Sequence, residues 1–445
     1  MRPLYQLLHW NYRTVSGLWY WARRRFTRAG LCLAAALGLA ATTGIDVERT
    51  LTYQSFAILL GLLGLAIAGS LRWRARFTVE RILPRLGTAG EPLRYRVRVG
   101  NPGATPQAGL TLLEDPADPR PDFPTWFALK QAEARGIRPF RVTPGRRSNP
   151  FHRLVLFEGE VPPLPARGEA EVAMQVLPLR RGVLRFAGVT LARPDAFGLF
   201  RALVRVPFPQ AVVVLPRRYH LPPVALPGSL RYQQGGVALA ANVGRSEEFV
   251  ALRDYRPGDP LRHIHWRSWA RAGRPIVKEF ADEYFVRHAL VLDTFTADPF
   301  SDELEEAVSV AASFACTVIT QESLLDLLFA GAQSYCFTAG RGLAEAGQIL
   351  EVLAGVSACP DRPFTVLENH VLEKAHQMSG CICVLLAWDE PRRRLVRRLG
   401  QAGVPVLVLV VVPPGTPPAA APTDGVERLH FLERGRIGAQ LAALQ

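Results

Sequence analysis

The residue types best suited to chemistry are concentrated in residues 245–280. Arginine and carboxylate side chains alternate there with aromatic rings, most densely between Glu248 and Arg271. Guanidinium groups hold carboxylates through paired hydrogen bonds, so this composition is typical of an internal ion-pair network. The same residue types also form exposed surfaces that recognise an acidic or phosphorylated partner, so the segment predicts one or the other. The candidate residues are Glu248, Phe249, Arg253, Tyr255, Gly258, Asp259, Arg262, His265, Trp266 and Arg271.

Two carboxylates form a second candidate site, because each follows a run of apolar residues. Asp293 ends the run that begins at Ala289, and Asp389 follows the run from Cys381 to Trp388. Loops at the carboxyl ends of parallel strands meet at one edge of a sheet, where binding sites form. A hard cation such as Mg²⁺ needs several oxygen ligands at such an edge. Asp293 and Asp389 are therefore the candidate ligands at this edge, and no resident cofactor is expected.

The sequence contains none of the common catalytic or phosphate-binding motifs. Its lysines, Lys130, Lys278 and Lys374, do not follow glycine, so a Walker-type phosphate loop cannot form. Gly-x-Ser-x-Gly, His-Glu-x-x-His and Gly-x-Gly-x-x-Gly sequences are absent as well. His263 and His265 would lie on one side of a strand, but without a third ligand nearby packed histidines are the simpler interpretation. No catalytic residue is assigned, and we do not expect an enzyme.

The elements that must position these residues differ along the chain. Residues 285–445 alternate between apolar strands and amphipathic helices, which predicts an α/β doubly wound sheet with Asp293 and Asp389 at one edge. The predicted strands are Ala289 to Asp293, Leu324 to Phe329, Cys381 to Trp388 and Val406 to Val412, and the predicted helices are 301–320, 342–356, 368–378 and 391–399.

Residues 77–210 follow a different pattern, in which short runs alternate apolar and polar residues between glycines and prolines. Alternation with a period of two predicts half-buried antiparallel strands, and hence an all-β sandwich domain. Residues 116–149 lack this periodicity and are predicted as a loop insertion. Residues 211–242 are rich in proline, glycine and alanine and are predicted as a linker to the segment 243–280.

The N-terminal part of the chain predicts a two-helix transmembrane hairpin. Residues 29–45 and 51–71 contain no charged side chain, and each run is near the ~20 residues that a helix needs to cross a bilayer. The formal charge of the 445 residues is +14, and ten arginines against two acidic residues place +8 of it in residues 1–76. Arginine-rich flanks face the cytoplasm, so both ends of the hairpin are expected there. Residues 1–28 predict a basic, aromatic segment beside the membrane.

The segment of alternating charges resembles the signature of the bacterial domain-of-unknown-function family fifty-eight. The matching positions are Glu248, Phe249, Leu252, Arg253, Tyr255, Pro257, Gly258, Asp259, Arg262, Ile264, Trp266, Ala270 and Arg271. Asp195 to Phe200 resembles a second landmark of that family. The resemblance implies a protein of the bacterial inner (cytoplasmic) membrane with its soluble domains in the cytoplasm. It also implies a domain similar to von Willebrand factor A domains and a MoxR-type AAA+ ATPase as partner.

Von Willebrand factor A domains commonly bind a divalent metal through an Asp-x-Ser-x-Ser loop and a later aspartate. In this chain Asp293 and Asp389 match the two aspartates, but Phe295 and Ala297 replace both serines. The resemblance therefore implies a degenerate metal site.

These observations favour a membrane-anchored interaction or scaffold protein, an adaptor for a MoxR-type ATPase in the maturation of proteins or complexes. One alternative is a metal-dependent binding domain or uncharacterised enzyme that uses the signature segment with Asp293 and Asp389. Another is binding of anionic lipid or nucleic acid through the arginines, although recognition of a specific nucleic acid is not expected.

Overall fold

The computed structural model describes residues 2–43, 50–118, 120–136, 153–222, 249–257, 259, 261–280, 287–320, 324–331, 333–339, 343–415 and 428–444. Glu248 and Gly258 of the predicted site lie outside the described residues. The chain forms two compact units, one comprising residues 1–217 with 353–355 and the other comprising residues 218–352 with 356–445.

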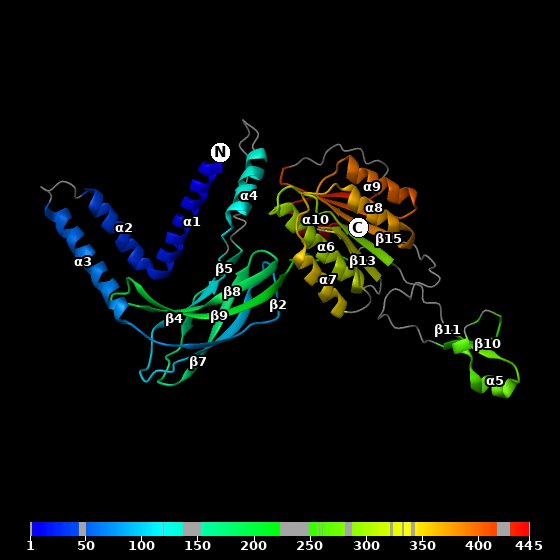
Figure 1. Ribbon diagram of the computed structural model, residues 1–445, viewed down its shortest axis with the longest axis horizontal. Helices are drawn as coiled ribbons and strands as arrows, with labels where there is room; N and C mark the ends of the chain where they lie inside the picture. The colour runs from blue at the N-terminus through cyan, green and yellow to red at the C-terminus, as the bar shows by residue number, and fades with distance from the viewer. Residues whose placement is uncertain are drawn as a thin grey trace. The chain divides into compact units, whose positions relative to one another are not determined.

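The first unit begins with three helices: α1 (Arg2–Arg25), α2 (Arg28–Thr43) and α3 (Thr50–Arg72). Helices α2 and α3 pack against each other (Figure 1). Among the described residues, α3 is the one helix that is both long and apolar enough to cross a membrane, whereas α2 is apolar but shorter. The structure therefore supports one candidate membrane span.

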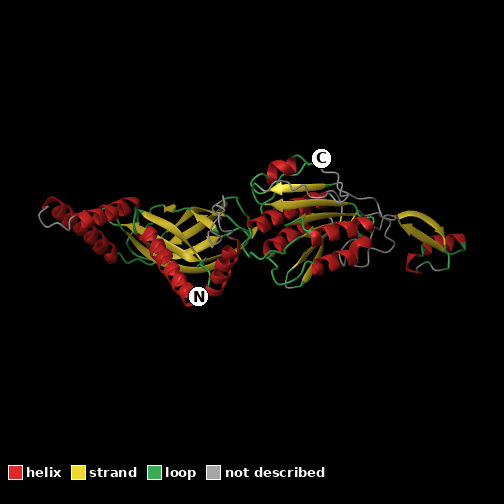
Figure 2. Cartoon of the chain, turned by 90° about the horizontal axis from the view of Figure 1, so that it is seen from above, coloured by secondary structure: helices red, strands yellow, loops and turns green. Residues whose placement is uncertain are grey.

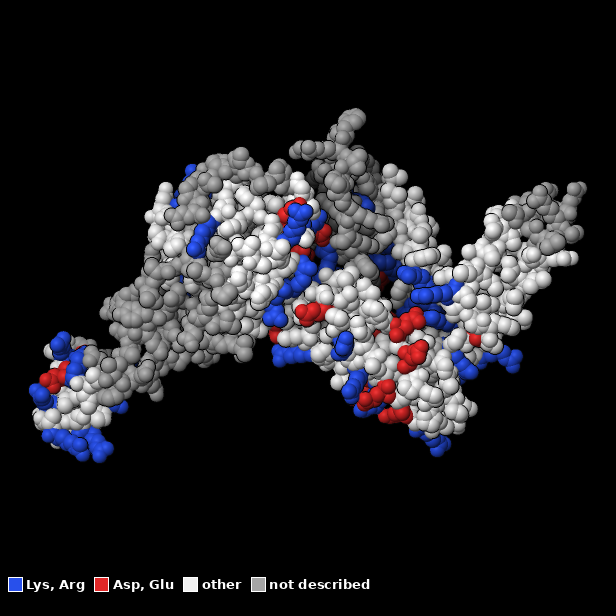
Figure 3. Space-filling view, turned by 180° about the vertical axis from the view of Figure 1, so that it is seen from behind, with Lys and Arg blue, Asp and Glu red and all other residues white. Residues whose placement is uncertain are grey.

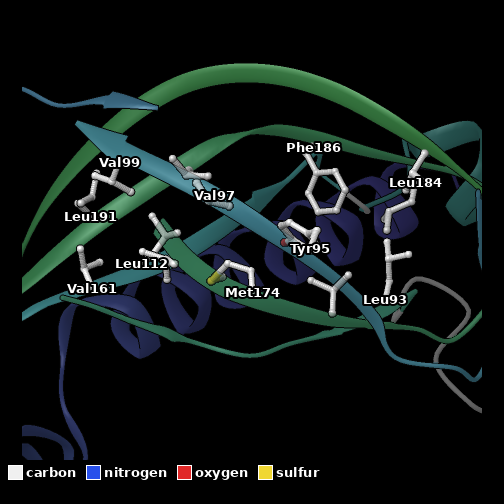
Figure 4. Packing of buried hydrophobic residues seen from close by; sticks show 14 of the residues in the cluster. Leu93, Tyr95, Val97, Val99, Leu112, Val161, Met174, Leu184, Phe186 and Leu191 are labelled. Atoms are coloured by element: carbon white, nitrogen blue, oxygen red, sulfur yellow. The ribbon is translucent and has the colours of Figure 1, made fainter. Parts of the chain in front are cut away.

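Two β-sheets enclose the core of the first unit. One has the strand order β1-β3-β7-β5 and the other the order β2-β9-β8-β4-β6. Along β3, Leu93, Tyr95, Val97 and Val99 are buried while the intervening arginines are more exposed, as the alternation predicts. These four side chains meet Phe186 and Leu191 of the other sheet (Figure 4). The strands are β1 (Thr78–Ile82), β2 (Leu86–Thr88), β3 (Leu93–Gly100), β4 (Leu110–Pro116), β5 (Leu154–Leu156), β6 (Gly159–Val161), β7 (Glu169–Pro178), β8 (Gly182–Pro194) and β9 (Arg201–Leu215).

The loop predicted over residues 116–149 is wrong in part, because residues 123–136 form helix α4 (Phe123–Gly136). The Asp122 carboxylate accepts a hydrogen bond from the Thr125 amide at the start of this helix. Trp126 and Phe127 pack edge-on against Tyr5 of α1. Tertiary packing stabilises this helix, and a weakly periodic sequence does not reveal such packing.

The second unit contains a six-stranded sheet with the order β14-β13-β12-β15-β16-β17 (Figure 2). All neighbouring strands are parallel except β13 and β14. The strands are β12 (Arg287–Leu292), β13 (Leu324–Ala330), β14 (Ser334–Ala339), β15 (Gly380–Leu385), β16 (Val406–Val412) and β17 (Leu429–Glu433), and the helices are α6 (Asp302–Thr320), α7 (Leu343–Gly355), α8 (Thr365–Lys374), α9 (Glu390–Gln401) and α10 (Ile437–Ala442).

Successive residues of β12 point to opposite faces of this sheet. Ala289 and Val291 lie in a core with α8 and α9, together with Cys381 and Cys383 of β15. Helix α6 contacts β12, β13, β15 and β16 without joining that core, so it covers the other face. The order and the two covered faces are those of the predicted doubly wound sheet.

The signature segment folds as a small hairpin of its own. Strands β10 (Phe249–Asp254) and β11 (Ile276–Phe280) pair in antiparallel fashion. Between them lie the short helix η2 (Leu261–His263) and helix α5 (Trp266–Ala272). Among the hairpin side chains that the structure describes, Ile264 and Val277 are the buried apolar ones.

Candidate functional site

Two ion pairs lie within the described part of the signature hairpin: an exposed one between Arg274 and Asp254 (3.1 Å), and a more buried one between Arg253 and Asp259. The guanidinium of Arg253, on β10, donates from Nη1 to Oδ2 of Asp259 (2.7 Å) and from Nη2 to Oδ1 (2.8 Å). The backbone amide of Arg256 donates to the same carboxylate (2.8 Å). The hydrogen bonds from Arg253 lower the pKa of Asp259 to about 2. Arg253 and Asp259 therefore hold the turn together, as the network interpretation predicts.

Four other arginines of the hairpin form a surface. Arg256, Arg262, Arg267 and Arg271 are exposed and make no ion pair with any described residue. Trp266 is 65% exposed and stacks on Trp269. Figure 3 shows Lys and Arg atoms on the outside of this hairpin, at the lower left. The segment is thus a network at its turn and an open basic, aromatic surface elsewhere.

Three more signature residues, Phe249, Tyr255 and His265, help to hold the hairpin together. Phe249 begins β10 opposite Phe280, and the Tyr255 amide donates to the Pro275 carbonyl (3.0 Å). His265 precedes α5, and its Nδ1 lies 2.7 Å from Ser268 Oγ. The prediction of a strand for His263 and His265 is wrong, because a one-turn helix and a helix cap place them instead.

Asp293 and Asp389 do meet at the carboxyl edge of the sheet, and Arg392 lies between them. Arg392 Nε donates to Asp293 Oδ2 (3.0 Å), and Nη2 donates to Oδ1 (3.3 Å). Arg392 Nη1 donates to Asp389 Oδ2 (2.6 Å). One guanidinium therefore joins both predicted carboxylates.

Two backbone amides also donate hydrogen bonds to the Asp293 carboxylate. The Phe295 amide donates to its Oδ1 (2.9 Å) and the Leu386 amide donates to its Oδ2 (3.0 Å). The Asp293 side chain is fully buried. A metal ion at this carboxylate would have to displace both these donors and a guanidinium. Among the described residues, no group of three or more His, Cys, Asp or Glu side chains is arranged to hold a metal.

Helix α9 places Arg392 at this position. Asp389 caps the helix by accepting a hydrogen bond from the Arg392 amide (3.3 Å), and Pro391 follows in the first turn. The guanidinium also lies over the Phe364 ring, 4.6 Å from its centroid. Burial lowers the pKa of Arg392, but the charges and hydrogen bonds of Asp293 and Asp389 together more than offset burial and raise the pKa above its ordinary value.

Sequence reasoning did not identify Arg392, Phe364 or Glu368 as part of this site. Glu368 is buried on α8 and accepts hydrogen bonds from Arg394 and Arg398 of α9. The sequence did contain a signal for Arg392. Asp389 follows an apolar strand and can cap a helix, and Arg392 lies three residues after it, within reach of the same carboxylate.

Residues 251–409 match the DUF58 family model. Its description is a protein of unknown function. The match confirms the family resemblance expected from the signature. It covers the described part of the hairpin from Ala251 onward and the sheet edge with Asp293, Asp389 and Arg392.

One relative is an uncharacterised protein, YeaD, of Bacillus subtilis. It is 30% identical over 114 residues, which is 25% of this chain and 28% of YeaD. The match therefore spans less than a third of either protein.

Solved structures resemble parts of the chain only weakly. A CARDB domain from Pyrococcus furiosus is 13% identical, covers 32% of this chain and 89% of its own, and has a TM-score of 0.17. A cohesin module from Clostridium perfringens is 7% identical, covers 32% of this chain and 98% of its own, and has a TM-score of 0.15. Likenesses at this level carry no inference about function.

Proposed function

We propose that this chain is a membrane-tethered interaction protein whose α/β unit, similar to a von Willebrand factor A domain, docks a MoxR-type AAA+ ATPase. The docking surface would be the carboxyl edge of the sheet, around Phe295, Ala297 and Trp388. The tether would be α3, with α2 returning beside it as the second helix of a hairpin.

The observation that carries this proposal is that Arg392 pairs with both Asp293 and Asp389, an arrangement that we call the Arg392 bridge. A buried carboxylate at a strand edge, such as Asp293, is a candidate for binding a cation or for performing chemistry. Here a guanidinium that belongs to the protein already neutralises Asp293 and Asp389. The described residues of this edge thus favour a preformed, metal-independent surface over an active site.

The residues around the bridge suit a protein partner. Ala297 is exposed, and Phe295 and Trp388 are half-buried at the same edge. Partly exposed aromatic side chains beside a rigid ion pair are common at the centres of protein interfaces. The strand order β14-β13-β12-β15-β16-β17 also follows the doubly wound order, in which ligands bind at this edge.

Co-purification tests the docking surface directly. The full chain, extracted in detergent, should retain a MoxR-type ATPase when ATP or a non-hydrolysable analogue is present. The substitution Ala297→Glu adds a charge to the proposed surface and should lower the recovered ATPase by about tenfold, equivalent to about 1.4 kcal/mol.

Ala402→Glu is the matched control, because Ala402 is also exposed but precedes β16, at the opposite edge of the sheet. Its recovery of the ATPase should equal that of the wild type. If the wild-type chain retains no AAA+ ATPase under either nucleotide, the adaptor proposal is wrong. Equal losses in both variants would contradict the assigned surface.

A further inference from the structure

Helix α1 has a long apolar face that is largely exposed in the described structure of its unit. Large hydrophobic residues along this helix are between 45% and 67% exposed. They are Leu4, Leu7, Leu8, Trp10, Val15, Leu18, Trp19, Tyr20 and Trp21. Leu4, Leu7, Leu8, Val15 and Leu18 recur at the three- and four-residue spacing that places side chains on one side of a helix. We call these five residues the open face of α1.

Another side of α1 packs against the rest of the first unit, whose two β-sheets give it the name β unit. Tyr5, His9 and Tyr12, also at helical spacing, contact Trp126 of α4. His9 is buried, and its Nε2 lies 3.2 Å from the Pro121 carbonyl oxygen. Figure 1 shows α1 beside α4. One side of α1 therefore packs within its own unit, and the open face lies next to that side and is exposed.

The charges of α1 indicate what covers the open face. The helix carries five arginines and no acidic residue, and three of the arginines form its last turn. The guanidinium groups of Arg23 and Arg24 lie over the rings of Trp19 and Tyr20. Arginine with tryptophan and tyrosine around a leucine face is the chemistry of a helix that lies in the interface of an anionic bilayer.

The close connection of α1 to the proposed membrane span also indicates that a bilayer covers the open face. Helix α2 begins three residues after α1 ends. Phe26 of the connection and Leu33 of α2 pack with Leu199 and Phe200, as do Ala66 and Ile67 of α3. The end of α1, the first turns of α2 and the last turns of α3 therefore meet at one loop of the β unit, so α1 ends where the proposed membrane span also ends.

We propose that α1 is an in-plane membrane anchor whose open face lies in the headgroup and acyl-chain boundary of an anionic bilayer. This inference rests on the proposed membrane tether, α3. It adds a second attachment that fixes the orientation of the β unit, because α1 is bound to that unit on another side. Thr27, in the connection, donates from its amide to the Leu199 carbonyl (3.1 Å), and Arg24 pairs with Asp115.

The test uses the full chain in vesicles of phosphatidylcholine and phosphatidylglycerol. Single cysteines labelled with an environment-sensitive fluorophore are placed by Leu7→Cys or Leu18→Cys on the open face. Gln6→Cys is the matched control, because Gln6 is exposed but does not lie on that face. Cys32, Cys316 and Cys336, which are at least partly exposed, are first replaced by alanine.

Brominated lipids should quench labels at positions 7 and 18 at least threefold more than the label at position 6. Resistance of the same sample to alkaline extraction reports separately on insertion of α3. If the chain resists extraction while the label at position 18 stays in water, the anchor is wrong and the tether stands. If the chain is extracted, both proposals fail. A label at position 18 that is shielded from water but not quenched would mean that a protein covers the face, which also overturns the anchor.

Discussion

At the scale of single residues, Arg392 determines the state of both carboxylates at the sheet edge. Its side chain is 10% exposed and that of Asp293 is fully buried. Removing one partner of a buried ion pair leaves a charge without compensation, which costs about 3–5 kcal/mol. We therefore expect Arg392→Ala to lower the free energy of unfolding of the α/β unit by about that amount. Hydrogen exchange of β12 and β15 peptides in increasing urea measures the change.

Arg397→Ala on the same helix is the control for this prediction. Arg397 pairs with Glu390, but both side chains are largely exposed, at 45% and 59%. An exposed pair contributes about 0–1 kcal/mol, so this variant should be close to wild type. Equal effects of the two substitutions would contradict the role assigned to Arg392. An increase in wild-type stability with millimolar Mg²⁺ would show that the carboxylates are open to metal after all.

The candidate site was only partly predictable from residue types. Asp293 and Asp389 could be placed together because strand ends in a doubly wound sheet converge at one edge. Arg392 could not be placed with them, because α9 contains several arginines and only tertiary structure shows which one turns inward. Similarly, the composition of the signature did not reveal that Asp259 pairs with Arg253 while Arg271 stays exposed.

At the scale of elements, the connection between α1 and α2 depends on a close approach of two backbones. A Cβ atom added at Gly30 would overlap the carbonyl of Leu199. Asp195 shapes that loop by accepting hydrogen bonds from the amides of Phe197, Leu199 and Phe200. The Asp195 to Phe200 landmark is therefore a docking loop for the helices.

We expect Gly30→Leu to separate the helices from this loop. The loop amides at residues 195–200 should then exchange hydrogen at least tenfold faster, because the backbone of Leu199 must move to admit the side chain. Gly38→Leu is the matched control, since a Cβ there meets no atom within 4 Å. Unchanged exchange in Gly30→Leu, measured by mass spectrometry on the full chain in micelles, would contradict the docking role of the loop.

The elements with strong periodicity were predictable, and those that depend on distant contacts were not. The apolar runs of β12, β13, β15 and β16 were found, because strands buried on both faces have continuous apolar sequences. The edge strands β14 and β17 were missed, since their side chains are mostly only half-buried and their sequences are mixed. Helix α4 was missed because its aromatic residues face α1 rather than a core of its own.

For the chain as a whole, charge and helix packing together predict the membrane topology of the proposed tether, α2 and α3. The start of α2 and the end of α3 pack with the same residues, Leu199 and Phe200. Because α2 also packs along α3, the two helices run in opposite directions, which is the arrangement that the proposed two-helix hairpin requires. Helix α2 has 16 residues and spans about 24 Å, so the proposed hairpin requires the bilayer to thin locally around α2.

The charges at the ends of the proposed hairpin predict the side of the membrane on which each end lies. Arg72, Arg74 and Arg76 follow α3 directly, whereas the connection at residues 44–49 has two acids and one arginine. By the positive-inside rule the connection should be periplasmic and the β unit cytoplasmic. Alkaline phosphatase inserted after residue 47 should be active, and after residue 77 inactive. Replacing the three arginines by glutamate should raise activity at residue 77 severalfold, whereas replacing them by lysine should not. Activity at neither position would contradict the hairpin.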